Sequence, residues 1–260
     1  MEWLYTFSGF GVGIIVGITG MAGGALMTPM LILMFGVAPS IAVGTDLLYA
    51  SLTKMAGSVV HSRRGTVDWR IARLLATGSL PAAILSIITL HQLALDDKQL
   101  KELITSVMGV ALLITATALL FNTYVLQIAR RKDGAIWALQ ASHLKYATIA
   151  TGVVLGALVT VSSVGAGALG LVVLLFLYPG IPPAKLVGTD ITHAVPLTLV
   201  AGLGHAAMGT VNYALLGSLL AGSVPGIYLG SHISTKIPER VLRNFLVIML
   251  LILGGKLVLT

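Results

Sequence analysis

The chain has 260 residues, of which 57% are hydrophobic and only 10% are charged, and its mean hydropathy is +0.98. Too little polar surface remains for a water-soluble domain, so the composition predicts an all-α polytopic protein whose solvent is the lipid bilayer. The net charge of +7 does not indicate nucleic-acid binding, because the basic residues fall in loops between apolar runs, where the positive-inside rule places them. Cysteine is absent, which excludes disulfides, thiolate metal sites and cysteine nucleophiles.

Ten apolar runs, bounded by charged or turn residues, predict ten helical segments along the chain. No basic stretch precedes the first run, so we expect it to be a helix of the mature protein rather than a cleavable signal. The second and seventh runs are about half of a roughly 20-residue span, and we expect broken or re-entrant helices there. The ten segments lie near 3–19, 25–37, 41–60, 69–90, 100–121, 144–162, 168–178, 185–204, 211–231 and 240–259.

An internal repeat divides the chain into two halves. Gly44-Thr45-Asp46 recurs as Gly188-Thr189-Asp190, at an offset of 144 residues. The same offset aligns residues 65–69 with 209–213 and residues 78–81 with 222–225, and an offset of 143 aligns residues 19–26 with 162–169. Matches in one register over this length indicate duplication. We therefore predict a first repeat at 1–121, a cytoplasmic linker at 122–143 and a second repeat at 144–260, with five segments in each repeat.

Loop charge predicts that the two repeats are inverted in the membrane. The loop after the third segment carries four arginines, whereas the equivalent loop at 205–213 has no Lys or Arg. Basic loops face the cytoplasm, so these equivalent loops are expected on opposite sides, with both termini outside. Non-spanning hairpins of segments one with two and six with seven would preserve this parity, which leaves six to ten crossings open. The four arginines are Arg63, Arg64, Arg70 and Arg73.

Hydroxyl and glycine residues precede or begin both short segments. Glycine lets backbone approach a ligand closely, and the free N–H groups at a helix start favour an anion. Short, glycine-interrupted segments at matching places in inverted halves indicate the midplane site of a transporter. The alternative is that the glycines only permit tight helix packing. The candidate substrate-binding residues of these breaks are Thr19, Gly20, Gly23, Gly24, Ser162, Ser163, Gly165 and Gly167.

Two acidic residues, Asp46 and Asp190, lie inside apolar segments, directly after Thr45 and Thr189. A charged side chain is costly at membrane depth and is usually functional there. Each aspartate has three interpretations: it caps a helix that restarts at a Gly-Thr break, it accepts a proton, or it helps to bind a cation. These four residues are the candidates for coupling or for a helix break.

Lys54 and His193 are polar residues without a like residue at the equivalent repeat position. Lys54 either neutralises an anion at depth or extends to the cytoplasmic interface a turn or two away. His193 stands three residues after Asp190, so it either pairs with that carboxyl on one helix face or stays neutral and hydrogen-bonded. The repeat-related His61 and His205 are expected at the membrane interface.

These motifs together resemble the sulfite exporter TauE/SafE family of membrane transporters. The resemblance rests on Gly20-Met21-Ala22-Gly23-Gly24 followed by Pro29, on Gly44-Thr45-Asp46, and on their second-half counterparts, and it covers essentially the whole chain. The second half departs from the pattern, since Val173 stands near the position equivalent to Pro29. The resemblance implies a multi-pass protein of the cell membrane, the cytoplasmic membrane in a prokaryote, that moves small sulfur-containing anions such as sulfite, thiosulfate or organosulfonates.

From the residues and this resemblance we predict a secondary transporter in which the two breaks converge and the halves rock to alternate access. An inside-negative potential favours anion exit by about 2.3 kcal/mol per charge per 100 mV, so export is expected unless a proton or cation is coupled. No cofactor or metal is expected, and no Gly-x-x-x-x-Gly-Lys loop is present for ATP. A homo-oligomer is compatible with this interpretation.

Three alternatives stay open from the sequence alone. The first is an anion channel, which a saturable, exchange-capable flux would argue against. The second is an intramembrane enzyme that uses Ser162 or Ser163 as nucleophile with His193 and Asp190 as base, although an enzyme has no need of two matched helix breaks. The third is a non-transporting scaffold.

Overall fold

The computed structural model describes residues 2–19, 23–93, 96–130, 141–234 and 239–259, and all regular structure in these ranges is helical. Ten helices follow one another along the chain, in the order in which the apolar runs predict them. The all-α prediction is therefore confirmed. The helices are α1 (Glu2–Thr19), α2 (Gly23–Phe35), α3 (Pro39–Arg63), α4 (Trp69–Gln92), α5 (Asp97–Arg130), α6 (Ala141–Ser162), α7 (Ala168–Leu177), α8 (Pro183–Ala207), α9 (Tyr213–Ser234) and α10 (Glu239–Leu259).

The helices α2 and α7 are short, as predicted, with 13 and 10 residues. At 1.5 Å per residue they extend about 20 and about 15 Å, less than the roughly 30 Å of a bilayer core. In contrast, α5 has 34 residues and runs to Arg130 rather than ending near residue 121. The first part of the stretch predicted as a linker is therefore helical.

Five helical stretches in the described residues are long and apolar enough to cross a membrane: Trp69–Gln92, Asp97–Phe121, His143–Ser162, Pro183–Ala207 and Tyr213–Gly230. Large apolar side chains are exposed on the outer faces of the bundle, among them Leu85, Val154 and Ile252. Apolar side chains in this position suit contact with lipid, because hydrocarbon chains are as apolar as leucine. The chain is a multi-pass membrane protein.

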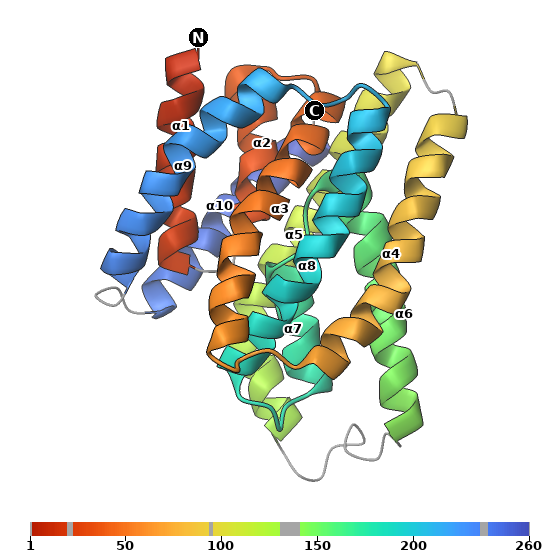
Figure 1. The fold of residues 1–260 in the computed structure, drawn as a ribbon, viewed down its shortest axis with the longest axis vertical. Helices are drawn as coiled ribbons and strands as arrows, with labels where there is room; N and C mark the ends of the chain where they lie inside the picture. Colours follow the sequence, from red (N-terminus) through yellow and green to blue (C-terminus); the bar gives the residue numbers. More distant parts are fainter. Residues whose placement is uncertain (1, 20–22, 94–95, 131–140, 235–238, 260) are drawn as a thin grey trace.

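Helices of one half pack mainly on helices of the other half. The closely packed pairs are α1 with α9, α4 with α6, α3 with α8 and α5 with α10. Figure 1 shows α1 beside α9 on one side of the bundle and α4 beside α6 on the other, with α2 toward the upper end and α7 toward the lower end. The helix α1 begins, and α10 ends, at the upper end of this view. The opposite orientation of the two halves in the membrane stays a prediction.

The close helix contacts recur at repeat-equivalent glycines. A Cβ added at Gly44 would collide with the Thr210 carbonyl oxygen, and one at Gly188 would collide with the Thr66 carbonyl oxygen. Both glycines lie inside unbroken helices, because α3 and α8 each begin at a proline in the first turn and continue through the Gly-Thr-Asp triplet. The interpretation of Thr45, Asp46, Thr189 and Asp190 as a helix break is therefore wrong. These glycines permit close backbone approach instead.

The two threonines of the triplets link the halves in matching ways. The Thr45 hydroxyl accepts a hydrogen bond from the backbone N–H of Asn212 at 3.0 Å. The Thr189 hydroxyl accepts the N–H of Asp68 at 2.8 Å, the equivalent contact at the other end of the α3–α8 pair. Each link attaches a central helix to the start of the outer helix that follows its partner. The central pair and the outer helices are thus held together at both ends.

Candidate functional site

The best-defined helix break separates α6 from α7. Its backbone takes left-handed values at three residues, with φ of 57° at Ser163, 114° at Gly165 and 126° at Gly167. A positive φ suits glycine and is uncommon for serine, so this turn depends on the glycines that the sequence places here. Ser162 and Ser163 are buried. Irregular backbone at this position is thus enclosed by protein, as a bilayer requires.

Asp46, on α3, connects this break to α2. Its carboxyl is fully buried and accepts hydrogen bonds from the hydroxyl of Thr28 on α2 and, at 2.9 Å, from the hydroxyl of Ser163. Both bonds reach Oδ2, and Oδ1 has no hydrogen-bond partner in the part of the chain that the structure describes. Asp46 therefore holds three segments together while keeping one oxygen atom available.

Lys54 reaches the same break from two turns further along α3. Its ammonium donates a hydrogen bond to the carbonyl oxygen of Ala166, with Nζ and O 2.7 Å apart. It also interacts electrostatically with Asp46 and Asp190. The alternative in which Lys54 extends to the interface is wrong, because its charge is held at the break by the carbonyl oxygen of the buried Ala166, just before the first turn of α7.

The second carboxyl, Asp190 on α8, lies against the first turn of α7. It is buried, and its Oδ1 atom occupies the space that a Cβ on Gly170 would need. Among the described residues no hydrogen bond reaches this Oδ1 atom. The glycine therefore makes room for the carboxyl, whose Oδ1 atom lies beside the helix start without a hydrogen bond from the described residues.

His193 does not pair with Asp190. Its Nε2 atom lies 2.8 Å from the hydroxyl of Ser79 on α4, in a buried contact, so of its two interpretations the structure shows the hydrogen-bonded one. The hydroxyl of Ser163 donates to Asp46 rather than to this histidine. The nucleophile–base contact that the enzyme alternative needs is therefore missing between Ser163 and His193.

The other predicted site residues divide into four groups. Gly165 and Gly167 shape the break, whereas the Ser162 hydroxyl is used locally, since it donates to the Leu158 carbonyl at 2.7 Å and accepts the Val164 N–H at 3.2 Å. Gly23 and Gly24 are the first two residues of α2. Gly20 and the side chain of Thr19 lie outside the described residues, so the meeting of the two breaks stays a prediction.

Sequence reasoning missed several hydroxyl groups that complete the site. Thr28 and Ser79 contact the functional side chains directly, and Ser58 donates to Thr192 at 3.0 Å across the α3–α8 contact. The available signal was a hydroxyl residue within an apolar run, which is weak because serine and threonine also bond to their own helix. His205, expected at the membrane interface, lies in the last turn of α8, where its ring is buried and bonds to the Thr160 carbonyl; its depth in the membrane stays a prediction.

The charged groups of the site are one ammonium and two carboxyls, all close to one helix break. No group of three His, Cys, Asp or Glu residues suited to a metal occurs in the described ranges. The ammonium can exchange its carbonyl acceptor for an anion, and buried carboxyls can take up protons. Such an arrangement is suited to binding and releasing an ion rather than to bond cleavage.

A multi-pass helical bundle with ionisable side chains at an internal helix break is an arrangement that membrane transporters use. Residues 5–257 match the family described as Sulfite exporter TauE/SafE. The chain therefore belongs to the TauE/SafE family of membrane transporters, as the sequence motifs predict. No solved structure matches it significantly.

The named relatives are bacterial proteins of similar length. The chain is 38% identical over 251 residues to the "Probable membrane transporter protein YjnA" of Bacillus subtilis (strain 168), covering 96% of this chain and 97% of that protein. It is 27% identical to "Probable membrane transporter protein YdhB" of the same organism, covering 90% and 91%. A "Probable membrane transporter protein" of Xylella fastidiosa (strain Temecula1 / ATCC 700964) is 26% identical, covering 88% and 84%.

Proposed function

We propose that the protein is a secondary transporter of small sulfur-containing anions, such as sulfite, thiosulfate or organosulfonates, which works by alternating access and favours export. The observation that carries this proposal is the contact of the Lys54 ammonium with the Ala166 carbonyl oxygen at the α6–α7 break. A cation at membrane depth that is bonded to a neutral carbonyl, rather than to a carboxylate, is available to an anion.

Lys54 and the start of α7 both favour an anion at the same place, the α6–α7 break. The first N–H groups of a helix lack acceptors within the helix, and the helix dipole favours negative charge there. An anion that replaced Ala166 as the acceptor of the Lys54 ammonium would lie next to this helix start, with the Ser163 hydroxyl nearby. An anion would add the attraction between opposite charges to the hydrogen bond of the ammonium, which favours this exchange.

The two carboxyls are the proposed coupling groups. Asp46 and Asp190 are buried near the same lysine, and each has an oxygen atom without a hydrogen-bond partner among the described residues. Protonation of either carboxyl would increase the net positive charge around the lysine and so favour an anion. Release of the proton would favour release of the anion, so that the two ions would cross the membrane together. Without such coupling, the membrane potential alone would drive the anion outward.

The alternating movement needs two halves that can rock against each other. The matching contacts of Gly44 with Thr210 and of Gly188 with Thr66 support an inverted repeat around the α3–α8 pair. Cysteine labelling tests this arrangement, because the chain has no cysteine. Ser62→Cys and Ala207→Cys, which place thiols at exposed positions in the last turns of α3 and α8, are expected to react from opposite sides of the membrane. Labelling from the same side would overturn the inverted arrangement.

Counterflow in proteoliposomes tests the transport activity itself. Vesicles loaded with unlabelled anion are given labelled sulfite, sulfate, thiosulfate or a small sulfonate, with and without a pH gradient. We expect saturable exchange of at least one sulfur-containing anion that is stronger than exchange of sulfate. Flux without saturation or exchange would indicate a channel, and no flux of any sulfur anion under either condition would overturn the substrate class.

A further inference from the structure

A second polar site lies away from the helix break, at the end of the bundle where α4, α6 and α8 begin. A pocket of about 180 Å³ opens there between the start of α4, the start of α6 and the α7–α8 connection. Its charged lining residues are Asp68, Arg70 and Lys145. This end is the one that loop charge predicts to face the cytoplasm.

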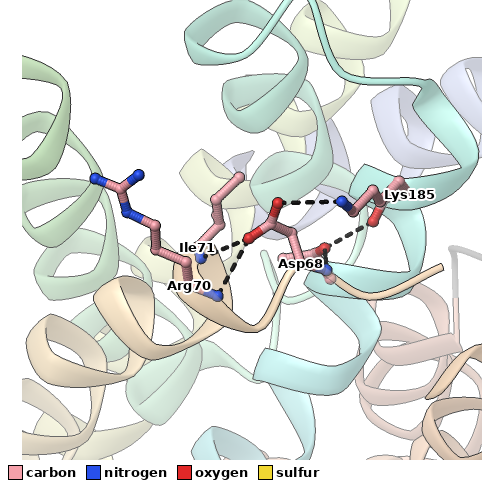
Figure 2. A network of polar contacts seen from close by, with 5 residues as sticks. Asp68, Arg70, Ile71 and Lys185 are labelled. Atoms are coloured by element: carbon pink, nitrogen blue, oxygen red, sulfur yellow. Dashed lines mark hydrogen bonds and ion pairs between the residues drawn. The ribbon is translucent and has the colours of Figure 1, made fainter. Parts of the chain in front are cut away.

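The negative charge of Asp68 is already compensated. Figure 2 shows its carboxyl between the start of α4 and Lys185: Oδ1 accepts the N–H groups of Arg70 and Ile71 at 3.1 and 3.3 Å, and Oδ2 lies 3.4 Å from the Lys185 ammonium. Asp68 is thus the N-cap of α4 and one member of an ion pair. It does not supply a counter-charge for the other cations of the pocket.

Arg70 and Lys145 are the cations left over. In the described residues neither side chain has a hydrogen bond or an ion pair, although the backbone N–H of Arg70 is bonded to Asp68. In Figure 2 the Arg70 guanidinium extends away from the Asp68 carboxyl, toward the side on which α6 lies. Lys145, near the start of α6, lines the same pocket. Two unpaired cations from different helices therefore face one small volume.

The equivalent place in the other half has none of these charges. The repeat offsets place Asn212 at the position of Asp68, Ala214 at that of Arg70 and Glu2 at that of Lys145. Two cations are thus replaced by an alanine and a glutamate. The repeat positions therefore do not preserve this pair of cations. Helix packing does not require the pair, since the packing contacts recur in both halves.

We propose that this pocket is a docking site where a small oxyanion such as sulfite is held before it enters the central site from the cytoplasmic end. This inference rests on the proposed function and adds a second binding site to it. Arginine offers a planar, two-pronged donor that matches an oxyanion, and lysine adds a point charge. A cleft with charge of one sign raises the local concentration of the opposite ion and its rate of arrival.

The competing explanation is that Arg70 and Lys145 only help to orient the protein in the membrane. Arg63 and Arg64 distinguish an effect on membrane orientation from an effect on anion docking. They are exposed residues at the same end, bear the same total charge and do not line the pocket. The test variant is Arg70→Gln/Lys145→Gln, and the matched control is Arg63→Gln/Arg64→Gln. Both remove two positive charges from the predicted cytoplasmic face.

The first measurement is sulfite transport from the cytoplasmic side, in inside-out vesicles at low and at near-physiological salt. We expect the pocket variant to raise KM about tenfold, the effect of one lost charge-assisted hydrogen bond, while kcat changes less than twofold. The control variant should keep the wild-type KM, and salt should raise the KM of the wild type more than that of the pocket variant. Equal KM changes in both variants, or none in the pocket variant, would overturn the docking site.

The second measurement does not depend on transport. Purified protein is treated with an amine-reactive acylating reagent with sulfite or with chloride at equal ionic strength, and the modification of Lys145 and Lys101 is followed by mass spectrometry. We expect sulfite to slow the acylation of Lys145 several-fold relative to Lys101, which is exposed and lies outside this pocket. Protection of Lys145 without any sulfite flux would support the docking site and count against the proposed function. Equal rates for both lysines would overturn the docking site.

Discussion

Asp46 and Asp190 occupy equivalent positions on the two central helices but have different surroundings. Asp46 accepts hydrogen bonds from Thr28 and Ser163, whereas no hydroxyl of the described residues reaches Asp190. The offset of 143 residues explains the difference, since it places Leu171 at the position of Thr28 and glycine at the position of Ser163. Neither replacement has a side chain that can donate.

This contrast shows that the two halves share their packing but not their polar chemistry. Close backbone contacts at Gly44 and Gly188 tolerate no side chain, so both halves need glycine there. A hydroxyl beside a carboxyl is not required for packing, and a similar-sized apolar residue can replace it. The carboxyl of the first half, Asp46, is therefore anchored by hydroxyls from both halves, Thr28 and Ser163, whereas the carboxyl of the second half, Asp190, has no hydroxyl donor among the described residues.

The shared packing predicts the largest effect. We expect Gly44→Ala and Gly188→Ala each to destabilise the protein by about 1–3 kcal/mol or more, because the new methyl group collides with a carbonyl oxygen of the neighbouring segment. Thermal unfolding in detergent measures this. Gly11→Ala is the matched control, since an added Cβ there meets nothing within 4 Å. If Gly44→Ala were as stable as the control, or if only one half were sensitive, the shared packing would be refuted.

The unequal chemistry predicts the next effect, on transport. Lys54→Met should lower anion counterflow by about tenfold to a hundredfold, because it removes a hydrogen-bonding cation worth about 1.5–3 kcal/mol. Thr198→Val, at the equivalent position on α8, should stay within twofold of the wild type, since the bonds of the Thr198 hydroxyl to described residues are all within its own helix. Comparable losses in both variants would place the lysine outside the transport step.

The two carboxyls are predicted to differ in their contribution to stability. Asp46→Ala should cost about 1–3 kcal/mol, because the buried hydroxyls of Thr28 and Ser163 lose their acceptor. Asp190→Ala should cost clearly less, because it leaves no described donor unpaired. Unfolding of the two variants under identical detergent conditions provides the measurement. Equal losses would mean that Asp190 has partners of the same strength.

The smallest effect is expected at the contact between α4 and α8. Ser79→Ala should destabilise the protein by about 1 kcal/mol by removing the hydroxyl bonded to His193. In a His193→Leu background the same substitution should have almost no further effect, and a double-mutant cycle in thermal unfolding measures this coupling. Additive losses would show that the two side chains do not act as a pair.

The number and order of the helices were predictable because each depends on a local run of apolar residues. The repeat was predictable because equivalent residues share their identity along the chain, as at Gly44 and Gly188. The two short helices followed from run length alone. The helices form because the surrounding lipid requires every apolar segment to satisfy its own backbone hydrogen bonds, whichever segments lie next to it.

The role of each polar residue required the tertiary structure. A glycine in an apolar run can mark a helix break or a close contact, and the Thr210 carbonyl that decides the matter for Gly44 is remote in sequence. Likewise Lys54 meets a carbonyl group 112 residues away, and His193 meets Ser79 from 114 residues away. No local pattern specifies such partners.

The sequence by itself therefore predicted ten helical segments in two related halves, with a glycine-rich stretch before each short segment. Only the tertiary structure decided that α3 and α8 run unbroken, that Lys54 is bonded to the α6–α7 break, and that hydroxyls of the described residues bond to Asp46 but not to Asp190. The physical reason is the range of the interactions. Hydrophobic burial in lipid is a property of each segment, whereas a hydrogen bond needs two groups that folding brings within about 3 Å of each other.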